Sequence, residues 1–232
     1  MKKIVSCIFS HEITKGMKSY GPIALLKAKK YSHELIYYVI KALSLSTKYV
    51  ELYIVLGFEE DKIKKKLSEF NIKNQAVSNT MYETTNFGYA FKLLINQLLS
   101  KTTDDITGFM FVNGNIILKK MPKYSTEHSW LLMDKKCPQE HSNIGCQISN
   151  NIIDYVFYDI GKNAWTETFF LTKRDLLKIH NNQELYNNHM FSFEIINTAI
   201  EKQNIEFKAV YLDNSSDLIK ITGIKDKNKI KI

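Results

Sequence analysis

The sequence predicts an α/β fold of three layers, in which helices cover both faces of a mixed, mostly parallel central sheet. Strand and helix patterns alternate in close order over residues 49–118. An antiparallel-looking region follows in the second half, and strand-then-helix order returns near the end of the chain. Phe109–Val112 is a continuous apolar run, as expected of a strand buried on both faces. These observations favour one central sheet over an all-helical or all-β fold.

The N-terminal elements place a polar loop after a strand. Lys3–Ser10 is predicted to be the first strand, and Glu34–Leu45 is predicted to be a helix with one apolar face. Between them, residues 11–22 form a long polar loop at the carboxyl end of the strand. Phosphate-binding groups commonly lie in such loops, so Lys15 and Lys18 are candidates for that role. The alternative is that both lysines are simply solvated.

Residues 49–118 are predicted to contain the next strands and helices, and their last strand stops at the end of the sheet where ligands bind. Apolar alternation predicts a strand from Val50 to Leu56, and Gly57 then marks a turn. Further along, Phe58–Asp61 puts acid at the start of a predicted helix with Ile63, Leu67 and Phe70 on one face. The patterns then predict a strand over Ile72–Ser78, a helix from Phe87 to Leu98 and a strand over Phe109–Val112. That last strand stops at Asn113-Gly114-Asn115. In open parallel sheets ligands bind at this end of the strands, so the pattern indicates a nucleotide- or sugar-binding domain.

The second half continues the sheet. The predicted elements are a strand at Trp130–Met133, a hairpin of Gln147–Asn150 and Tyr155–Tyr158, a strand at Trp165–Leu171, a helix to Ile179 with Thr172 as N-cap, a helix at Phe191–Lys202, a strand at Ile205–Tyr211 and a short capped helix at Asp213–Ile221. Residues 1–222 are predicted to form a single domain, followed by a basic, frayed tail over 223–232.

Length and composition indicate the number of domains and the expected location of the protein. The chain has 232 residues, is 44% hydrophobic and contains only 3 Pro and 9 Gly, which fits one globular domain without a long linker. No apolar run reaches the length needed to span a membrane. The start of the chain superficially resembles a signal peptide, but its apolar stretch is too short and contains polar residues. We therefore expect a cytoplasmic protein, or one inside a viral particle, without a membrane partner.

The net charge and the cysteine positions indicate which ligands and binding partners to expect. The formal net charge of +8 favours attraction to phosphates, although a lysine-rich surface encoded by an AT-rich genome gives the same number. The basic residues are spread out and form no stripe interleaved with aromatic residues, so nucleic acid is an unlikely partner. Cys137, His141 and Cys146 could supply three ligands to zinc, but their spacing matches no standard site, which favours a chance cluster. Three cysteines make no paired framework and favour a reducing compartment.

Four short motifs, in order, resemble the nucleotidyltransferase superfamily, which includes the sugar-phosphate, choline-phosphate and molybdenum-cofactor nucleotidylyltransferases. They are Ile54–Phe58, Asn79–Tyr82 with Thr85-Asn86, Phe111–Asn115, and Tyr211–Leu218, which resembles the family ending "Ile-Asp-Thr-Pro-Glu-Asp-Leu". The resemblance covers nearly the whole chain. It implies the glycosyltransferase-A type fold, as in nucleotide-diphospho-sugar transferases.

The resemblance also implies a reaction. A phosphorylated small molecule, of the sugar- or choline-phosphate class, attacks the α-phosphorus of a nucleoside triphosphate, pyrophosphate leaves, and positioned cations including Mg²⁺ neutralise the developing charge. Carried over by motif, the catalytic residues are Lys15 and Lys18, the nucleotide-contacting residues are Thr14, Asn86, Asn113 and Gly114, and the magnesium ligands are Asn115 and Asp213. By the same resemblance, Trp165 and Glu167 lie on the strand that faces the pocket of the second substrate and help to shape it, although core packing explains Trp165 equally well.

The sequence departs from the family pattern at its phosphate and metal positions. The pattern "Gly-x-Gly-Thr-Arg" is met here by His11 to Lys15, so both glycines are lost and Glu12 adds negative charge. The family lysine after a proline is Ile23, and the metal-binding Asp is Asn115, whose amide brings no charge. Each lost charged contact in such a site costs on the order of 2–4 kcal/mol of transition-state stabilisation.

Two hypotheses follow from these departures. The first is a divergent nucleotidyltransferase that uses Lys15 or Lys18 with Asn115 and Asp213. The second is a catalytically inactive descendant, kept as a binding or structural component of a larger, viral assembly with protein partners. A glycosyltransferase is a weaker third hypothesis, because Asn113-Gly114-Asn115 is only the amide version of Asp-x-Asp. No local signature of Ser-His-Asp or Cys-His catalysis is present, and Cys7 is predicted to be a core residue. His11 and His128 are predicted to be exposed or satisfied, with a position near the site as the alternative.

Overall fold

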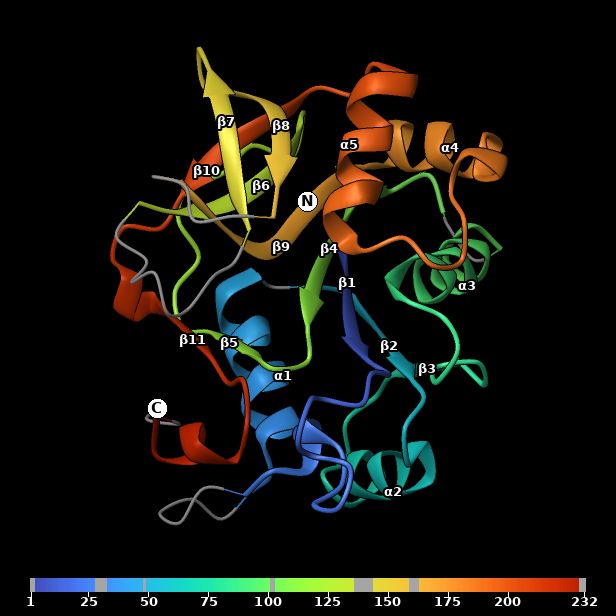
Figure 1. The fold of residues 1–232 in the computed structure, drawn as a ribbon, viewed down its shortest axis with the longest axis vertical. Helices are drawn as coiled ribbons and strands as arrows, with labels where there is room; N and C mark the ends of the chain where they lie inside the picture. The colour runs from blue at the N-terminus through green and yellow to red at the C-terminus, as the bar shows by residue number, and fades with distance from the viewer. Residues whose placement is uncertain are drawn as a thin grey trace.

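The computed structural model describes residues 3–27, 33–47, 49–100, 103–135, 144–158 and 163–229. Within them a nine-stranded sheet has the order β3-β2-β1-β4-β9-β6-β10-β8-β7 (Figure 1). Its strands are β1 (Lys3–Ser10), β2 (Glu51–Leu56), β3 (Gln75–Ser78), β4 (Ile106–Asn113), β6 (Ser129–Asp134), β7 (Gly145–Ser149), β8 (Ile152–Phe157), β9 (Ala164–Thr172) and β10 (Phe207–Tyr211). A two-stranded sheet joins β5 (Ile116–Leu118) and β11 (Leu218–Lys220).

Five α-helices and four 3₁₀-helices complete the described part of the chain. The α-helices are α1 (Leu35–Thr47), α2 (Glu60–Glu69), α3 (Phe87–Leu99), α4 (Lys173–Asn181) and α5 (Ser192–Gln203). The 3₁₀-helices are η1 (Ile23–Leu25), η2 (Gln183–Leu185), η3 (Ser215–Asp217) and η4 (Ile224–Lys229). None of these helices is long and apolar enough to cross a membrane.

The sheet is mixed, as predicted, but its parallel part is confined to one half. Strands β3, β2, β1 and β4 run parallel, and β6 and β10 form a further parallel pair. The prediction of a mostly parallel sheet is therefore not fully confirmed. Its other neighbours pair antiparallel, because β9 inserts between β4 and β6 and the β7–β8 hairpin closes the far edge.

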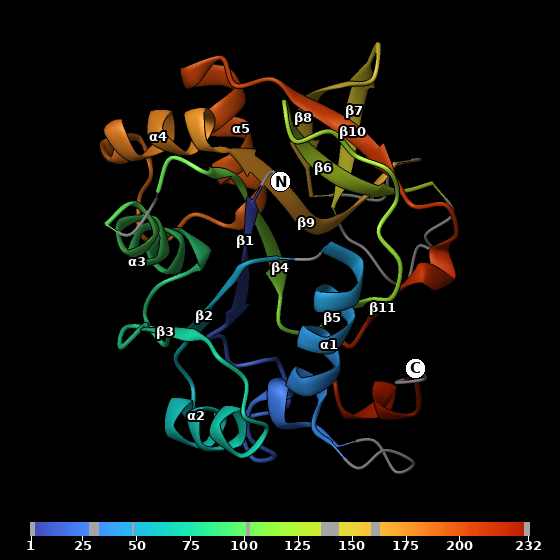
Figure 2. The same ribbon diagram turned by 180° about the vertical axis from the view of Figure 1, so that it is seen from behind.

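Helices cover both faces of the sheet (Figures 1 and 2). The core on one face packs α3, α4 and α5 against the sheet, and the cores on the other face contain α1, α2 and the small β5–β11 sheet. The sequence of β4 is apolar over Phe109–Val112 because this strand lies between two cores. Phe109 and Phe111 enter the first core, while Met110 and Val112 enter a core on the opposite face. The predicted three-layer architecture is confirmed.

Local signals explain several element boundaries. The Thr172 side chain accepts a hydrogen bond from the Asp175 backbone N–H and so caps α4, as predicted. At the end of β2, a side chain on Gly57 would place Cβ 2.7 Å from the His11 carbonyl oxygen and 2.8 Å from the Tyr82 Cβ. Only glycine allows this close approach between β2 and the first loop.

The C-terminal segment differs from its prediction. The segment Asp213–Ile221, predicted to be a short helix, forms η3 and then the strand β11. In the antiparallel β5–β11 pair, Leu218 lies opposite Leu118 and Lys220 opposite Ile116. The chain therefore runs back toward Asn115, whose carbonyl accepts a hydrogen bond from the Ile221 N–H at 2.9 Å.

The described part of the predicted basic tail contains a 3₁₀-helix. Residues 224–229 form η4, and the Asp226 carboxylate accepts hydrogen bonds from both the backbone N–H and the hydroxyl of Thr222. Ile221, just before this turn, is fully buried in the core next to α1. These contacts hold the end of the described chain against the domain.

Candidate functional site

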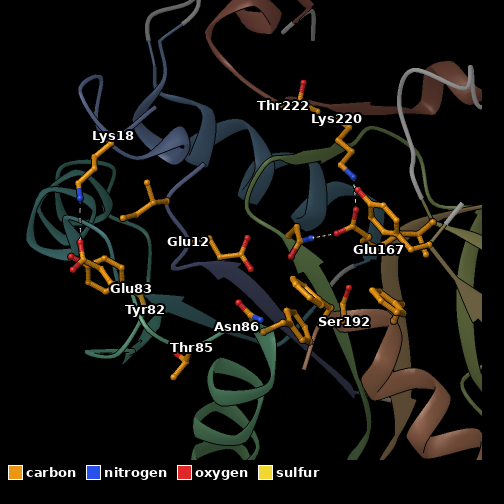
Figure 3. Close-up of a pocket in the computed structure, with 17 residues that line it drawn as sticks. Glu12, Lys18, Tyr82, Glu83, Thr85, Asn86, Glu167, Ser192, Lys220 and Thr222 are labelled. Atoms are coloured by element: carbon orange, nitrogen blue, oxygen red, sulfur yellow. Dashed lines mark hydrogen bonds and ion pairs between the residues drawn. The ribbon is translucent and has the colours of Figure 1, made fainter. Parts of the chain in front are cut away.

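A cavity of about 770 Å³ lies beyond the carboxyl ends of β1 and β4. It is lined by the first loop, the loop before α3, the start of α5, β9 and β11 (Figure 3). A smaller cavity of about 180 Å³ adjoins it. Four residues line both cavities: Glu12, Asn113, Glu167 and Lys220. We call these four residues the central cluster.

Glu167 lies at the middle of this cluster, where β9 is irregular. Leu131 of β6 pairs with Phe169 and Met133 pairs with Trp165, so β9 carries extra residues between these pairs. Within this bulge Glu167 has a left-handed backbone with φ of 60°. Bulges re-aim side chains, and here the carboxylate is turned into the cavity.

Two neighbours hold the Glu167 carboxylate. The Asn113 side-chain N–H donates to its Oε2 at 2.8 Å, and the Lys220 ammonium contacts its Oε1. The side chains of Lys220 and Glu167 are only 19% and 17% exposed, respectively. The lysine is thus held in the wall that the two cavities share, where the lower effective dielectric strengthens its interactions.

Glu12 and His11 come from the first loop. The Glu12 side chain is 65% exposed, at the mouth of the cavity. Partial desolvation by the surrounding protein and the charge of Glu167 raise its pKa, while Lys220 acts in the opposite direction. His11 is 1% exposed, and burial lowers its pKa to about 4, so the ring is neutral at pH 7. Neither ring nitrogen has a hydrogen-bond partner among the described residues.

A second ion pair lies at the rim of the cavity. The Lys18 ammonium lies 3.6 Å from the Glu83 carboxylate, and these side chains are 75% and 57% exposed (Figure 3). An ion pair this exposed contributes little stability and exchanges partners readily. Lys18 is therefore available to a ligand that enters from the rim.

Aromatic side chains form another wall of the main cavity. Phe191 and Phe193, at the start of α5, have nearly parallel rings with centroids 5.9 Å apart. Tyr158 lies beside Phe193 with a centroid distance of 6.3 Å, and both Tyr158 and Phe191 are more than half exposed. Such rings can stack on a planar or apolar part of a ligand.

The structure brings several predicted residues together. Lys18, Asn86 and Asn113 line the main cavity, and Thr14, Gly114 and again Asn113 line the small one. Asn86 is not free, because its side-chain N–H donates to the His189 carbonyl at 2.6 Å. The structure leaves Lys15 exposed and outside the lining of both cavities.

The predicted metal pair does not converge. Asn115 lines the small cavity, and its buried side-chain oxygen has no hydrogen-bond partner among the described residues. Asp213, however, lines neither cavity and pairs with Lys120 at 2.7 Å, with about half of its side chain exposed. The physical reason is β11: a strand advances about 3.3 Å per residue, so its length separates Asp213 from Asn115. The segment beside Asn115 is Lys220–Thr222.

Other predictions about side chains are settled case by case. Cys7 is buried in the core with a raised pKa, as expected of a structural thiol. Trp165 is a core residue whose indole N–H donates to the Thr168 carbonyl, whereas Glu167 does line the pocket. His11 borders the small cavity, but His128 lines neither cavity. Cys137 and His141 of the considered zinc cluster lie outside the described residues.

The sequence also held a signal that the prediction missed. In β11 and just beyond it, Ile219 and Ile221 pack into the core next to α1, while Lys220 and Thr222 line the main cavity. This alternation of apolar and polar residues is the pattern of a half-buried strand. Because the prediction aligned the family ending with the segment around Asp213, it did not recognise this strand.

The chain has the fold of the nucleotidyltransferase superfamily, as the resemblance implied. Its sequence matches no protein-family model and no curated protein. The likeness is therefore one of structure.

Three of the similar solved structures cover nearly the whole chain. The CTP:phosphocholine cytidylyltransferase from Streptococcus pneumoniae matches with a TM-score of 0.74 and 12% identity, covering 98% of this chain and 97% of that one. The inositol-1-phosphate CTP transferase from T. maritima matches with a TM-score of 0.70 and 14% identity, covering 100% and 98%. A UDP-glucose pyrophosphorylase complexed with UDP-glucose matches with a TM-score of 0.67 and 9% identity, covering 99% and 97%. At these identities the comparisons establish the fold alone.

Proposed function

We propose that this protein binds a nucleoside triphosphate in the main cavity and transfers its nucleotidyl group to a phosphorylated small molecule. The observation that carries the proposal is the position of Lys220. Its side chain lines both cavities, which lie beyond the carboxyl ends of parallel strands, the place where α/β sheets bind ligands. The structural neighbours are nucleotidyltransferases for phosphocholine, inositol phosphate and sugars, which supports the same class of substrate.

The chemistry assigns roles to side chains of this chain. A phosphate oxygen of the acceptor attacks the α-phosphorus, the bond to the β-phosphate oxygen breaks, and pyrophosphate leaves with its electron pair. Lys220 neutralises charge that develops on the α-phosphoryl oxygens, and Lys18 at the rim contacts the outer phosphates. The aromatic wall formed by Tyr158, Phe191 and Phe193 packs against a part of the ligand that carries no phosphate.

Magnesium, when bound, would supply further positive charge to the transferred phosphoryl group. The pair Asn115 and Asp213 does not fit such an ion, because Asp213 lines neither cavity and is paired with Lys120. The carboxylates of Glu12 and Glu167 line both cavities, and the carboxylate of Glu83 lines the rim of the main one. No group of three or more His, Cys, Asp or Glu side chains in the described part of the chain is arranged to hold a metal ion. Two carboxylates with water and phosphate oxygens are nevertheless the usual ligands of magnesium beside a nucleotide.

The test is release of pyrophosphate. The purified protein is incubated with each nucleoside triphosphate and Mg²⁺, together with phosphocholine, inositol 1-phosphate or a hexose 1-phosphate, and pyrophosphate is measured. We expect one combination to release pyrophosphate with wild-type protein and Lys220→Met to abolish the release. No release above background from any combination would contradict transfer.

A second function is favoured by the charges of the cavity. Both lysines that line the main cavity are paired with glutamates, and Glu12 adds a carboxylate without a lysine of its own. Unless these pairs exchange, a triphosphate meets excess negative charge. The alternative proposal is therefore a catalytically inactive descendant that serves as a binding or structural component of a larger assembly. Nucleotide binding without pyrophosphate release, or no binding at all, would favour this alternative.

A further inference from the structure

We propose that the aromatic wall formed by Tyr158, Phe191 and Phe193 binds a quaternary ammonium group, and that the acceptor of the nucleotidyl group carries one. The wall lines the same cavity of about 770 Å³ as Lys18 and Lys220. The part of this inference that concerns the acceptor rests on the proposed function. Binding of the ammonium group itself can be measured without a nucleotide.

Phe191 is a large apolar side chain that the fold does not use for packing. Its ring is 54% exposed and belongs to none of the hydrophobic cores of the described residues. It also occupies the N-cap of α5, where Ser, Thr, Asp and Asn are the residues that stabilise a helix. Because this ring adjoins other exposed rings in a cavity, it indicates a surface that contacts a ligand.

The backbone at the start of α5 places two rings side by side. Residues two apart within a helix do not face each other, but Phe191 has an extended backbone, with φ of −78° and ψ of 167°, before the helix begins. Its ring stacks on that of Phe193, with planes 4° apart. The Phe191 N–H donates to Glu194 Oε2 at 2.7 Å, and Phe193 packs against a core. The wall is therefore formed before a ligand arrives.

The wall offers ring faces and few hydrogen-bonding groups. Tyr158 adds a third ring, and the polar side-chain atoms of the wall are the Tyr158 hydroxyl and that of Ser192, between the two phenylalanines (Figure 3). A sugar carries several hydroxyls that each need a partner, whereas a quaternary ammonium has no N–H and needs none. The negative faces of aromatic rings attract such a cation within about 6 Å of the ring centroid.

The charges of the cavity also favour a cation. Three glutamates and two lysines are among the described residues that line it, although the chain as a whole carries +8. Phosphates that bind Lys18 and Lys220 leave the carboxylates of Glu83 and Glu167 without their cations, and Glu12 adds a third carboxylate. A cationic group on the acceptor supplies positive charge to the same cavity and so favours this exchange of partners.

The experiment compares choline with its uncharged isostere 3,3-dimethylbutan-1-ol, in which carbon replaces the ammonium nitrogen. Neither probe carries a phosphate, so neither depends on the lysines. Binding to the full chain is titrated by ligand-observed NMR at up to tens of millimolar. We expect wild-type protein to bind choline at least about fivefold more tightly than the isostere, because the ring faces and the carboxylates attract only the cation. High salt should reduce this preference.

Two variants test the wall itself. Phe191→Leu and Tyr158→Leu each keep an apolar side chain but remove a ring. We expect each to weaken choline binding by about threefold to tenfold, with little change for the isostere. Tyr20→Leu is the matched control, because Tyr20 is as exposed as Tyr158, at 66%, but lines neither cavity. We expect this control to change choline binding less than about twofold.

Several results would overturn the proposal. They are choline that does not bind at tens of millimolar, an isostere that binds as tightly as choline, ring variants that bind choline as wild type does, and a loss in Tyr20→Leu as large as theirs. Both ring variants replace exposed side chains, and thermal melting checks that they fold. Choline binding is measured without a triphosphate and triphosphate binding without choline, so failure of this proposal and failure of the proposed function can be told apart.

Discussion

The cavity contains two lysine–glutamate pairs that differ in almost everything except their chemistry. Lys18 and Glu83 at the rim are mostly exposed and lie 3.6 Å apart. Lys220 and Glu167 at the centre are in direct contact and less than one fifth exposed. Water screens the charges of the first pair strongly and those of the second pair weakly. The second pair therefore interacts more strongly, although the charges are the same. Composition cannot reveal this difference, because it arises from where the strands place each side chain.

The pairs also differ in how firmly they are anchored. Lys220 lies on β11, which pairs with β5, and Glu167 lies on β9 and accepts a hydrogen bond from Asn113. Lys18 and Glu83 lie on loops. Side chains on regular elements hold a geometry more reproducibly than side chains on loops. We therefore expect the central pair to determine ligand binding and the rim pair to adjust it.

The largest expected effect is on ligand binding at the centre. Lys220→Met removes a charged contact to phosphate inside the cavity, which costs about 2–3 kcal/mol, or roughly 30- to 150-fold in affinity for the triphosphate. Isothermal titration calorimetry with the nucleotide that wild-type protein binds measures it. Affinity that falls less than about threefold would place the phosphate elsewhere.

An intermediate effect concerns stability at Glu167. Glu167→Ala removes the partner of Lys220 but keeps a side chain on a left-handed backbone, whereas Glu167→Gly also removes the strain. We expect the glycine variant to be more stable than the alanine variant by about 1 kcal/mol. For a chain of this length the difference is about 2–4 °C in Tm, measured by calorimetry. Equal Tm values would show that position 167 is not strained.

The smallest expected effect is at the rim. Lys18→Met and Glu83→Gln each break an exposed ion pair, so each should change the free energy of unfolding by less than about 1 kcal/mol. Lys18→Met should weaken triphosphate binding less than about fivefold, because water already screens this charge. Chemical denaturation and calorimetry measure both quantities. If Lys18→Met weakened binding as much as Lys220→Met, the contrast between rim and centre would fail.

The fold was predictable because apolar periodicity reports burial directly. The strand pattern of Lys3–Ser10 matches β1 residue for residue, and the apolar run around Phe109 becomes a strand between two cores. The orientation of β9 was less predictable. A strand buried on both faces has the same apolar sequence whether its neighbours run parallel or antiparallel, so the extent of the parallel part of the sheet was overestimated.

The site was harder to predict because the order of the motifs does not determine which residues face the cavity. Asn113 and Gly114 follow a strand whose end is clear from the sequence, and both line the small cavity. Asp213 was assigned by likeness to a short ending, and the strand β11 carries the chain on from there to Lys220. Glu12 was recognised only as an unfavourable charge. Its approach to Glu167 depends on the path of a loop, which periodicity does not describe.

The central claim is that the middle of this cavity binds a nucleoside triphosphate. The most direct measurement is thermal melting of wild-type protein and Lys220→Met with each nucleoside triphosphate, with and without Mg²⁺. At about a hundred times its dissociation constant, a nucleotide that binds only the folded state adds about 2.7 kcal/mol. The account predicts a rise in Tm of several degrees for one nucleotide with wild-type protein, larger with Mg²⁺, and little rise with Lys220→Met at the same nucleotide concentration. It is contradicted if no nucleotide raises the Tm of wild-type protein, or if Lys220→Met shows the same rise.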